Sequence, residues 1–144
     1  MGAAPREVYD VVIDFAVYPR LFPELRSVRV LETVGNRVRV EFRATVVIAV
    51  RYVLDLVCDS QTPSVVWTFV DGDVVSGSEG GWRFTPEGSG TRVDYRASMD
   101  VSAPLPGFVL RKVTDALLAA SIPNMLAAVS REVLRRQQRG ASAP

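Results

Sequence analysis

The sequence predicts an α+β fold in which one antiparallel sheet curves around a long C-terminal helix. Between residues 27 and 101, apolar and polar residues alternate, as in antiparallel strands that are solvated on one face. Residues 104–107 (Pro-Leu-Pro-Gly) end this pattern, and from there to Gln138 apolar residues recur at helical spacing. A curved sheet around one helix leaves room for a hollow, so we expect a cavity for an apolar small molecule.

The composition is that of one globular domain. The chain has 144 residues, of which 48% are hydrophobic, and we expect a single domain over residues 1–144. A net charge of +1 gives no sign of nucleic-acid binding, so we expect no DNA partner. The single cysteine excludes an intrachain disulfide. The absence of histidine removes the commonest general base and metal ligand, so we expect no metal and no cofactor.

The apolar segments are too short for a membrane span, which needs about 18 apolar residues. Charged residues between Arg6 and Asp14 interrupt any signal-peptide core. We therefore expect a cytoplasmic protein. The strong preference for arginine over lysine indicates a GC-rich bacterial genome.

The N-terminal part predicts helix. Pro5 suits a first helical turn, and residues 6–15 follow it with apolar side chains on one side. Tyr18 and Phe22 each precede a proline, which disfavours helical backbone at both positions. Residues 14–23 are therefore expected to form a broken helix pair or a tight loop.

Six strands are expected to follow. Alternation and turn residues place them at residues 27–32, 37–46, 51–59, 65–69, around 82–84, and 91–101. Gly35-Asn36 and residues 87–90 are predicted turns, and the Gly- and Ser-rich residues 76–81 are predicted to be a loop or an irregular strand start.

The apolar run at residues 46–50 lies where two of these strands must reverse, although it contains no turn-forming residue. Such a tip would guard the cavity mouth, touch a membrane surface or be buried in a dimer. The alternative is that the turn lies elsewhere and the run is buried strand.

Two features of the C-terminal helix carry expectations. Pro123 removes a backbone hydrogen bond, so we expect a bend at residues 121–124. The arginines at positions 131, 135, 136 and 139 suit the negative end of a helix dipole. The alternative for these arginines is contact with anionic lipid or RNA.

Catalytic constellations are sparse, because Ser-His-Asp and Cys-His arrangements, zinc sites and phosphate loops all lack essential residues. We therefore predict no catalytic residues. The informative set is the face of the strands and helix that points inward, where aromatic residues form a packed core or line a pocket with a few polar groups. The candidate ligand-binding residues are Phe42, Tyr52, Leu54, Trp67, Phe69, Trp82, Phe84, Tyr95, Ala97, Met99, Val113, Leu117, Ala120 and Asn124.

Three segments resemble the START-like (SRPBCC) superfamily in its polyketide cyclase / coenzyme-Q-binding branch. Residues 4–19, ending in Tyr18-Pro19, resemble the opening helix of this family. Residues 81–84 with 90–95 resemble its central hairpin, and residues 104–136 resemble its long helix. The resemblance implies a helix-grip fold with a cavity for lipids, quinones, sterols or polyketides.

The resemblance leaves the function open among three alternatives. We favour binding or transport of a hydrophobic small molecule over an enzyme of the polyketide cyclase or aromatase type, in which Tyr52 or Tyr95 would act as an acid. The third alternative is an interaction module like the ribosome-associated toxins of the family. The ligand is not determined by the sequence.

One departure from the family concerns the first strand. Such proteins begin with a strand before the first helix, whereas only Met1 to Ala4 precede it here. The sheet is therefore expected to have six strands, or seven with the first one missing. An unpaired edge invites pairing with another chain, so we expect a tendency to form homodimers.

Overall fold

The structure is a computed structural model that describes residues 1–46 and 48–142. The side chains of residues 46, 117–124 and 140–142 lie outside the described part.

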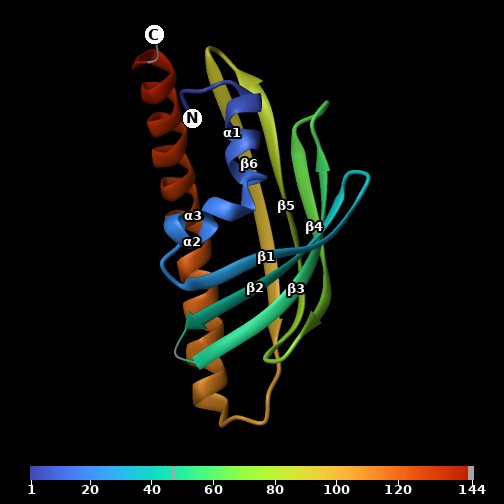
Figure 1. Ribbon diagram of the computed structural model, residues 1–144. Helices are drawn as coiled ribbons and strands as arrows, with labels where there is room; N and C mark the ends of the chain where they lie inside the picture. The colour runs from blue at the N-terminus through green and yellow to red at the C-terminus, as the bar shows by residue number, and fades with distance from the viewer. Residues whose placement is uncertain (47, 143–144) are drawn as a thin grey trace.

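Six antiparallel strands form one sheet in the order β1-β2-β3-β4-β5-β6, so each strand pairs with its neighbour in sequence. Figure 1 shows this sheet curving around the long helix α3. The predicted α+β architecture is confirmed. The strands are β1 (Leu25–Val34), β2 (Arg37–Val46), β3 (Ile48–Asp59), β4 (Ser64–Gly72), β5 (Val75–Glu87) and β6 (Gly90–Val101).

Residues 76–81 were expected to form a loop or an irregular strand start. The loop alternative was wrong, because β5 runs through these residues. Gly80 pairs in register with Trp67. A Cβ at Gly80 would lie 2.4 Å from the Trp67 indole and 2.3 Å from the Arg96 carbonyl oxygen. The reason for glycine at this position is therefore close packing of the indole against the strand backbone. It is not the need for a turn or loop.

Four helical segments accompany the sheet: α1 (Pro5–Val12), the 3-10 helix η1 (Phe15–Val17), α2 (Tyr18–Leu21) and α3 (Gly107–Ser142). The broken helix pair predicted for residues 14–23 is confirmed as η1 and α2. The expectation that Tyr18 avoids helical backbone was wrong, because Tyr18 begins α2 with φ −55° and ψ −44°, whereas Phe22 is extended as expected. The backbone of α3 is helical throughout its length. Residues 121–124 belong to this one helix, and the bend predicted there stays a prediction; their side chains lie outside the described part.

The main core lies between the inner face of the sheet and the helices. Val8, Val11 and Val12 of α1 are almost fully buried there. From α3, Val129 and Val133 join the same cluster. Each fully buried valine contributes roughly 1.5–3 kcal/mol of transfer free energy. The amphipathic pattern of α1 therefore fixes it across the concave side of the sheet.

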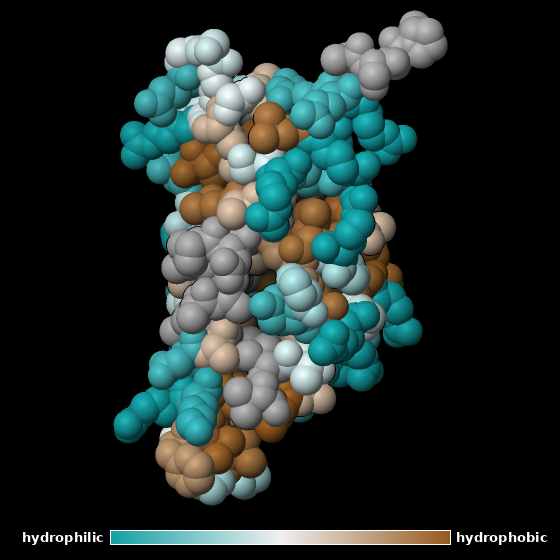
Figure 2. Space-filling view, turned by 90° about the vertical axis from the view of Figure 1, so that its left-hand side faces the viewer, coloured by the Kyte–Doolittle hydropathy of each residue, from teal (hydrophilic) through white to brown (hydrophobic). Residues whose placement is uncertain are grey.

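The chain reverses between β2 and β3 inside the apolar run, since Val46 pairs with Ile48. The reversal therefore lies within the apolar run, and the alternative that the turn lies elsewhere was wrong. Nearby, Ala44 and Val50 form a second buried cluster, against which Ile48, Val74 and Ala116 of α3 pack. Figure 2 shows apolar surface gathered at the end of the molecule where α3 begins, and Phe108 there is 67% exposed.

The end of α3 is fixed by charge. Glu132 is buried, and its carboxylate accepts hydrogen bonds from Arg20 of α2 at 2.9 Å and from Arg135 at 2.6 Å. Arg136 donates to Asp14 at 2.7 Å. One of the arginines predicted to interact with the helix dipole is Arg136. It connects α3 directly to the N-terminal helical region through its ion pair with Asp14. We call Arg20, Glu132, Arg135, Arg136 and Asp14 the arginine cluster.

The N-terminus reaches the free edge of β6. The Met1 ammonium donates to the Thr91 carbonyl at 2.9 Å, and the Thr91 amide donates to the Met1 carbonyl at 2.8 Å. Gly90 permits this approach, because a Cβ there would lie 2.3 Å from the Met1 carbonyl oxygen. In the described part of the chain, no strand pairs with the rest of this edge.

Among the described residues, no helix is long and apolar enough to cross a membrane.

Candidate ligand cavity

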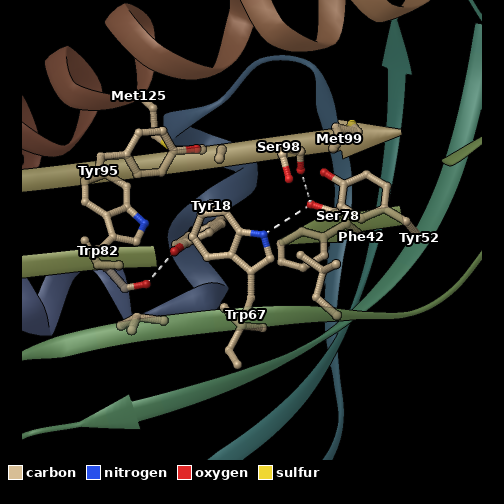
Figure 3. A pocket seen from close by; sticks show the side chains of 15 residues that line it. Tyr18, Phe42, Tyr52, Trp67, Ser78, Trp82, Tyr95, Ser98, Met99 and Met125 are labelled. Atoms are coloured by element: carbon tan, nitrogen blue, oxygen red, sulfur yellow. Dashed lines mark hydrogen bonds between the residues drawn. The ribbon is translucent and has the colours of Figure 1, made fainter. Parts of the chain in front are cut away.

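A cavity of about 130 Å³ lies between the inner face of the sheet, the N-terminal helical region and α3 (Figure 3). Its wall is mainly aromatic and aliphatic, and none of its described lining residues is charged. The lining residues are Val12, Tyr18, Phe42, Tyr52, Leu54, Leu56, Val65, Trp67, Ser78, Trp82, Tyr95, Ala97, Ser98, Met99 and Met125.

Cross-strand pairs build the aromatic part of the wall. Phe42 of β2 lies opposite Tyr52 of β3, and their rings stack at 5.2 Å with an interplanar angle of 15°. Trp82 of β5 lies opposite Tyr95 of β6, with ring centroids 4.5 Å apart. Because side chains alternate along a strand, each of these pairs faces the cavity as a unit.

A short polar chain orients the Trp67 indole. Its Nε1–H donates to the Ser78 hydroxyl at 3.2 Å, and that hydroxyl donates to the Ser98 carbonyl at 2.9 Å. These bonds connect β4, β5 and β6 across the cavity wall. The polar end of the indole is therefore satisfied by protein, and its apolar face is left for the cavity.

Tyr18 is a structural part of the wall. Its hydroxyl donates to the Val12 carbonyl, and its ring makes edge contacts with Phe15 at 5.4 Å and with Phe22 at 5.3 Å. Complete burial raises the pKa of Tyr18. The side chain thus joins α2 to the end of α1.

Tyr52 and Tyr95 differ from Tyr18, because neither hydroxyl makes a hydrogen bond to any residue that the structure describes. Figure 3 shows the two rings entering from opposite ends of the view, with both hydroxyl groups pointing toward the space between them. Burial raises the pKa of Tyr95 to about 12 and raises that of Tyr52 as well. Both phenols are therefore neutral near pH 7.

The structure brings many of the predicted residues together and places others elsewhere. Phe42, Tyr52, Leu54, Trp67, Trp82, Tyr95, Ala97 and Met99 line the cavity. Phe69, Phe84 and Val113 do not line it: Phe84 packs edge-on against Tyr9 at 6.4 Å, Phe69 packs beside the core, and Val113 is fully buried. Leu117, Ala120 and Asn124 lie outside the described side chains.

Thr91, an inward polar position, also lies away from the cavity, because its hydroxyl donates to the Ala3 carbonyl. The prediction missed several lining residues. Leu56 and Val65 share the inward parity of their strands, so alternation alone was enough to find them. Ser78 lies in the stretch predicted to be a loop or an irregular strand start, and Val12, Tyr18 and Met125 come from helices that only the fold brings to the sheet.

In the described part of the chain, no three potential metal-ligating side chains gather. The thiol of Cys58 is free, and burial raises its pKa.

Comparison with solved structures agrees with this architecture. TTHA0849 from Thermus thermophilus superposes with a TM-score of 0.82 at 27% identity, covering 99% of this chain and 94% of that chain. The Zhui aromatase/cyclase from Streptomyces sp. R1128 gives a TM-score of 0.78 at 20% identity over 99% and 93% of the two chains. A START superfamily protein from Mycobacterium smegmatis gives 0.71 at 16% identity over 94% and 92%.

A comparison with curated protein sequences gives no significant match. The family model described as "Polyketide cyclase / dehydrase and lipid transport" matches residues 1–136. This match covers the sheet and nearly all of α3, and the solved structures share the same START-like arrangement. The chain therefore belongs to the polyketide cyclase / dehydrase and lipid transport family.

Proposed function

We propose that this protein binds and carries a hydrophobic small molecule, such as a lipid, quinone or polyketide, in the cavity between sheet and α3. The observation that carries the proposal is the cavity wall, in which aromatic and aliphatic side chains predominate and the described lining residues include no charge. Binding pockets for apolar ligands have this composition, with a few polar groups that fix orientation.

Energetics support occupancy of the cavity. The wall offers a space of about 130 Å³ bounded mainly by aromatic and aliphatic side chains. An apolar ligand in this space gains dispersion contacts with those side chains and removes its own apolar surface from water. Ligand binding is therefore expected to stabilise the folded state.

Native mass spectrometry of freshly purified protein, followed by denaturing extraction, tests the proposal. An additional mass that is released as a lipid, quinone or polyketide supports a carrier and identifies the ligand class. A bare protein that also takes up no apolar probe in titration counts against it. The titration has a built-in signal, because both tryptophans of the chain line the cavity.

A cyclase or aromatase activity is the second candidate, and the cavity-facing hydroxyls of Tyr52 and Tyr95 are the observation that favours it. They are placed to hydrogen-bond the carbonyls of a buried poly-ketone, which would orient it for ring closure. Their raised pKa values make them poor proton donors, so positioning is the more suitable role. Turnover of a poly-ketone substrate that falls in the Tyr→Phe variants would support this activity.

The interaction-module alternative receives less support. Arg135 and Arg136 form ion pairs with Glu132 and Asp14 within the chain, so their charge is already neutralised in part.

A further inference from the structure

The polar groups of the cavity wall fall into two kinds. Ser78 and Tyr18 are satisfied by the protein: Ser78 accepts from Trp67 and donates to the Ser98 carbonyl, and Tyr18 donates to the Val12 carbonyl. Tyr52 and Tyr95 make no hydrogen bond to any described residue, although their hydroxyls face the cavity (Figure 3). These two tyrosines are therefore the phenols of the described wall that have a hydrogen bond to offer a ligand.

A buried hydroxyl without a partner is costly, because it has given up water and gained nothing. Among the described residues no fully buried side-chain oxygen lacks a partner, so both phenol oxygens keep some contact with solvent. A purely hydrocarbon ligand would remove that contact and give neither phenol a partner. A ligand with an oxygen near one or both phenols would accept a hydrogen bond from each of them. The rest of its surface would contact the aromatic rings.

The charge of the ligand is restricted as well. No described side chain on the wall is charged, and the nearby ion-pair network, the arginine cluster, does not include a lining residue. A carboxylate moved into this space would lose its hydration without meeting a cation. Neutral phenols at pH 7 hydrogen-bond a carbonyl or hydroxyl oxygen without that cost.

The size of the cavity sets the scale of the buried part. A cavity of about 130 Å³ is close to the roughly 150 Å³ of an engineered apolar cavity that holds benzene. One ring, with its substituents, is the unit that fits.

We propose that Tyr52 and Tyr95 are the specificity-determining residues of the cavity and select a neutral, ring-containing ligand that bears carbonyl or hydroxyl oxygen over hydrocarbons and carboxylates. This inference rests on the proposed binding function and names the chemical class that the same cavity takes.

A matched set of one-ring probes tests the selection by isothermal titration calorimetry at pH 7. Ethylbenzene and acetophenone differ by a methylene in place of a carbonyl, and benzoate adds the charge. We expect acetophenone to bind about tenfold tighter than ethylbenzene, the size of one net hydrogen bond, and benzoate to bind more weakly than both.

The Tyr52→Phe, Tyr95→Phe double variant removes two oxygens and keeps both rings. It is expected to bind acetophenone no better than ethylbenzene and to bind ethylbenzene more tightly than the unmodified protein does, because the hydrocarbon no longer covers two unpaired hydroxyls. Tyr9→Phe is the matched control, since Tyr9 is buried in the core but does not line the cavity, and it is expected to keep the preference for acetophenone.

The outcomes separate the two levels of the proposal. Ethylbenzene binding with no preference for acetophenone, or tight binding of benzoate, overturns the selection and leaves the binding function intact. A preference that survives the double variant also overturns the role of the two tyrosines. Failure of all three probes to bind the unmodified protein contradicts the binding function itself.

Discussion

Gly80 shows how one residue shapes the candidate site. A side chain at this position would collide with the Trp67 indole and with the Arg96 carbonyl, which belongs to the neighbouring strand backbone. Since neither the backbone nor a hydrogen-bonded indole moves freely, the site tolerates only glycine.

Gly80→Ala is therefore expected to destabilise the protein by about 1–3 kcal/mol, as overpacking does, and to reduce probe binding by displacing Trp67. Urea unfolding and a shift in tryptophan emission measure the two effects. Gly107→Ala is the control, because a Cβ there meets open space. Equal stability of the two variants would show that the indole is not confined by Gly80.

Ala97 and Ala44 form a second comparison at the residue scale. Ala97 lines the cavity, whereas Ala44 is 4% exposed in the separate cluster with Val50. Ala97→Leu is expected to retain stability and to lose probe binding, because the new side chain occupies the cavity. Ala44→Leu is expected to cost about 1–3 kcal/mol in a packed site. Equal losses of stability would mean that the cavity is filled by its own side chains.

Among the elements, α3 depends on the arginine cluster. Removing the charge of Glu132 leaves Arg20 and Arg135 without their carboxylate, so Glu132→Gln is expected to lower the free energy of unfolding by about 2 kcal/mol. Asp10→Asn is the matched control, because the Arg6–Asp10 pair is exposed and is worth less than about 1 kcal/mol. Chemical unfolding of the two variants beside the unmodified protein measures the difference, and equal losses would contradict the role of the cluster.

The same carboxylate gives a pH dependence. Hydrogen bonding from Arg135 lowers the pKa of Glu132, and Arg39 and Arg51 lower the pKa values of Asp55 and Glu41 on the outer face of the sheet. A carboxylate whose pKa is lower in the folded state than in the unfolded state stabilises the fold, and this contribution is complete above the ordinary carboxyl pKa. It is lost progressively as the pH falls below about 4.5. Stability measured from pH 6 to 3 should therefore decline, and less steeply in Glu132→Gln. An identical slope in the variant would contradict this assignment.

The elements were the most predictable level of this structure. Strict alternation in β2, β3 and β6 predicted their faces, because a period of two assigns every side chain to one side. The glycines of β5 suggested a loop, since sequence alone does not show that an indole from β4 covers Gly80. At the candidate site, the alternation of side chains along each strand predicted which strand residues face the cavity. It did not find Tyr18 and Met125, because they reach the cavity only through the packing of helices on the sheet.

At the scale of the whole molecule, the outer edge of β6 is one of the two free edges of the described sheet, the other being the outer edge of β1. In the described chain only Met1 pairs with the β6 edge, at Thr91, and alternating charged side chains such as Arg92 and Asp94 accompany this strand. Unpaired edges favour association, and charges oppose it. We expect concentration-dependent dimers, measured by light scattering during size-exclusion chromatography. A monomer that persists at millimolar concentration would contradict edge pairing.

The arginine cluster also makes the two ends of α3 unequal. Around Glu132 the helix is held by ion pairs and by buried Val129 and Val133, whereas Arg111, Lys112 and Asp115 near its start form no ion pair with a described residue. Local opening is therefore expected to begin at the start of α3, beside the apolar β2–β3 tip, and to stop before the cluster. Backbone amides near residues 108–116 should exchange with deuterium faster than those near 129–135. If local opening exposes the cavity, a ligand would then reach it past the apolar start of α3, while the ion pairs around Glu132 keep the other end of the helix in place.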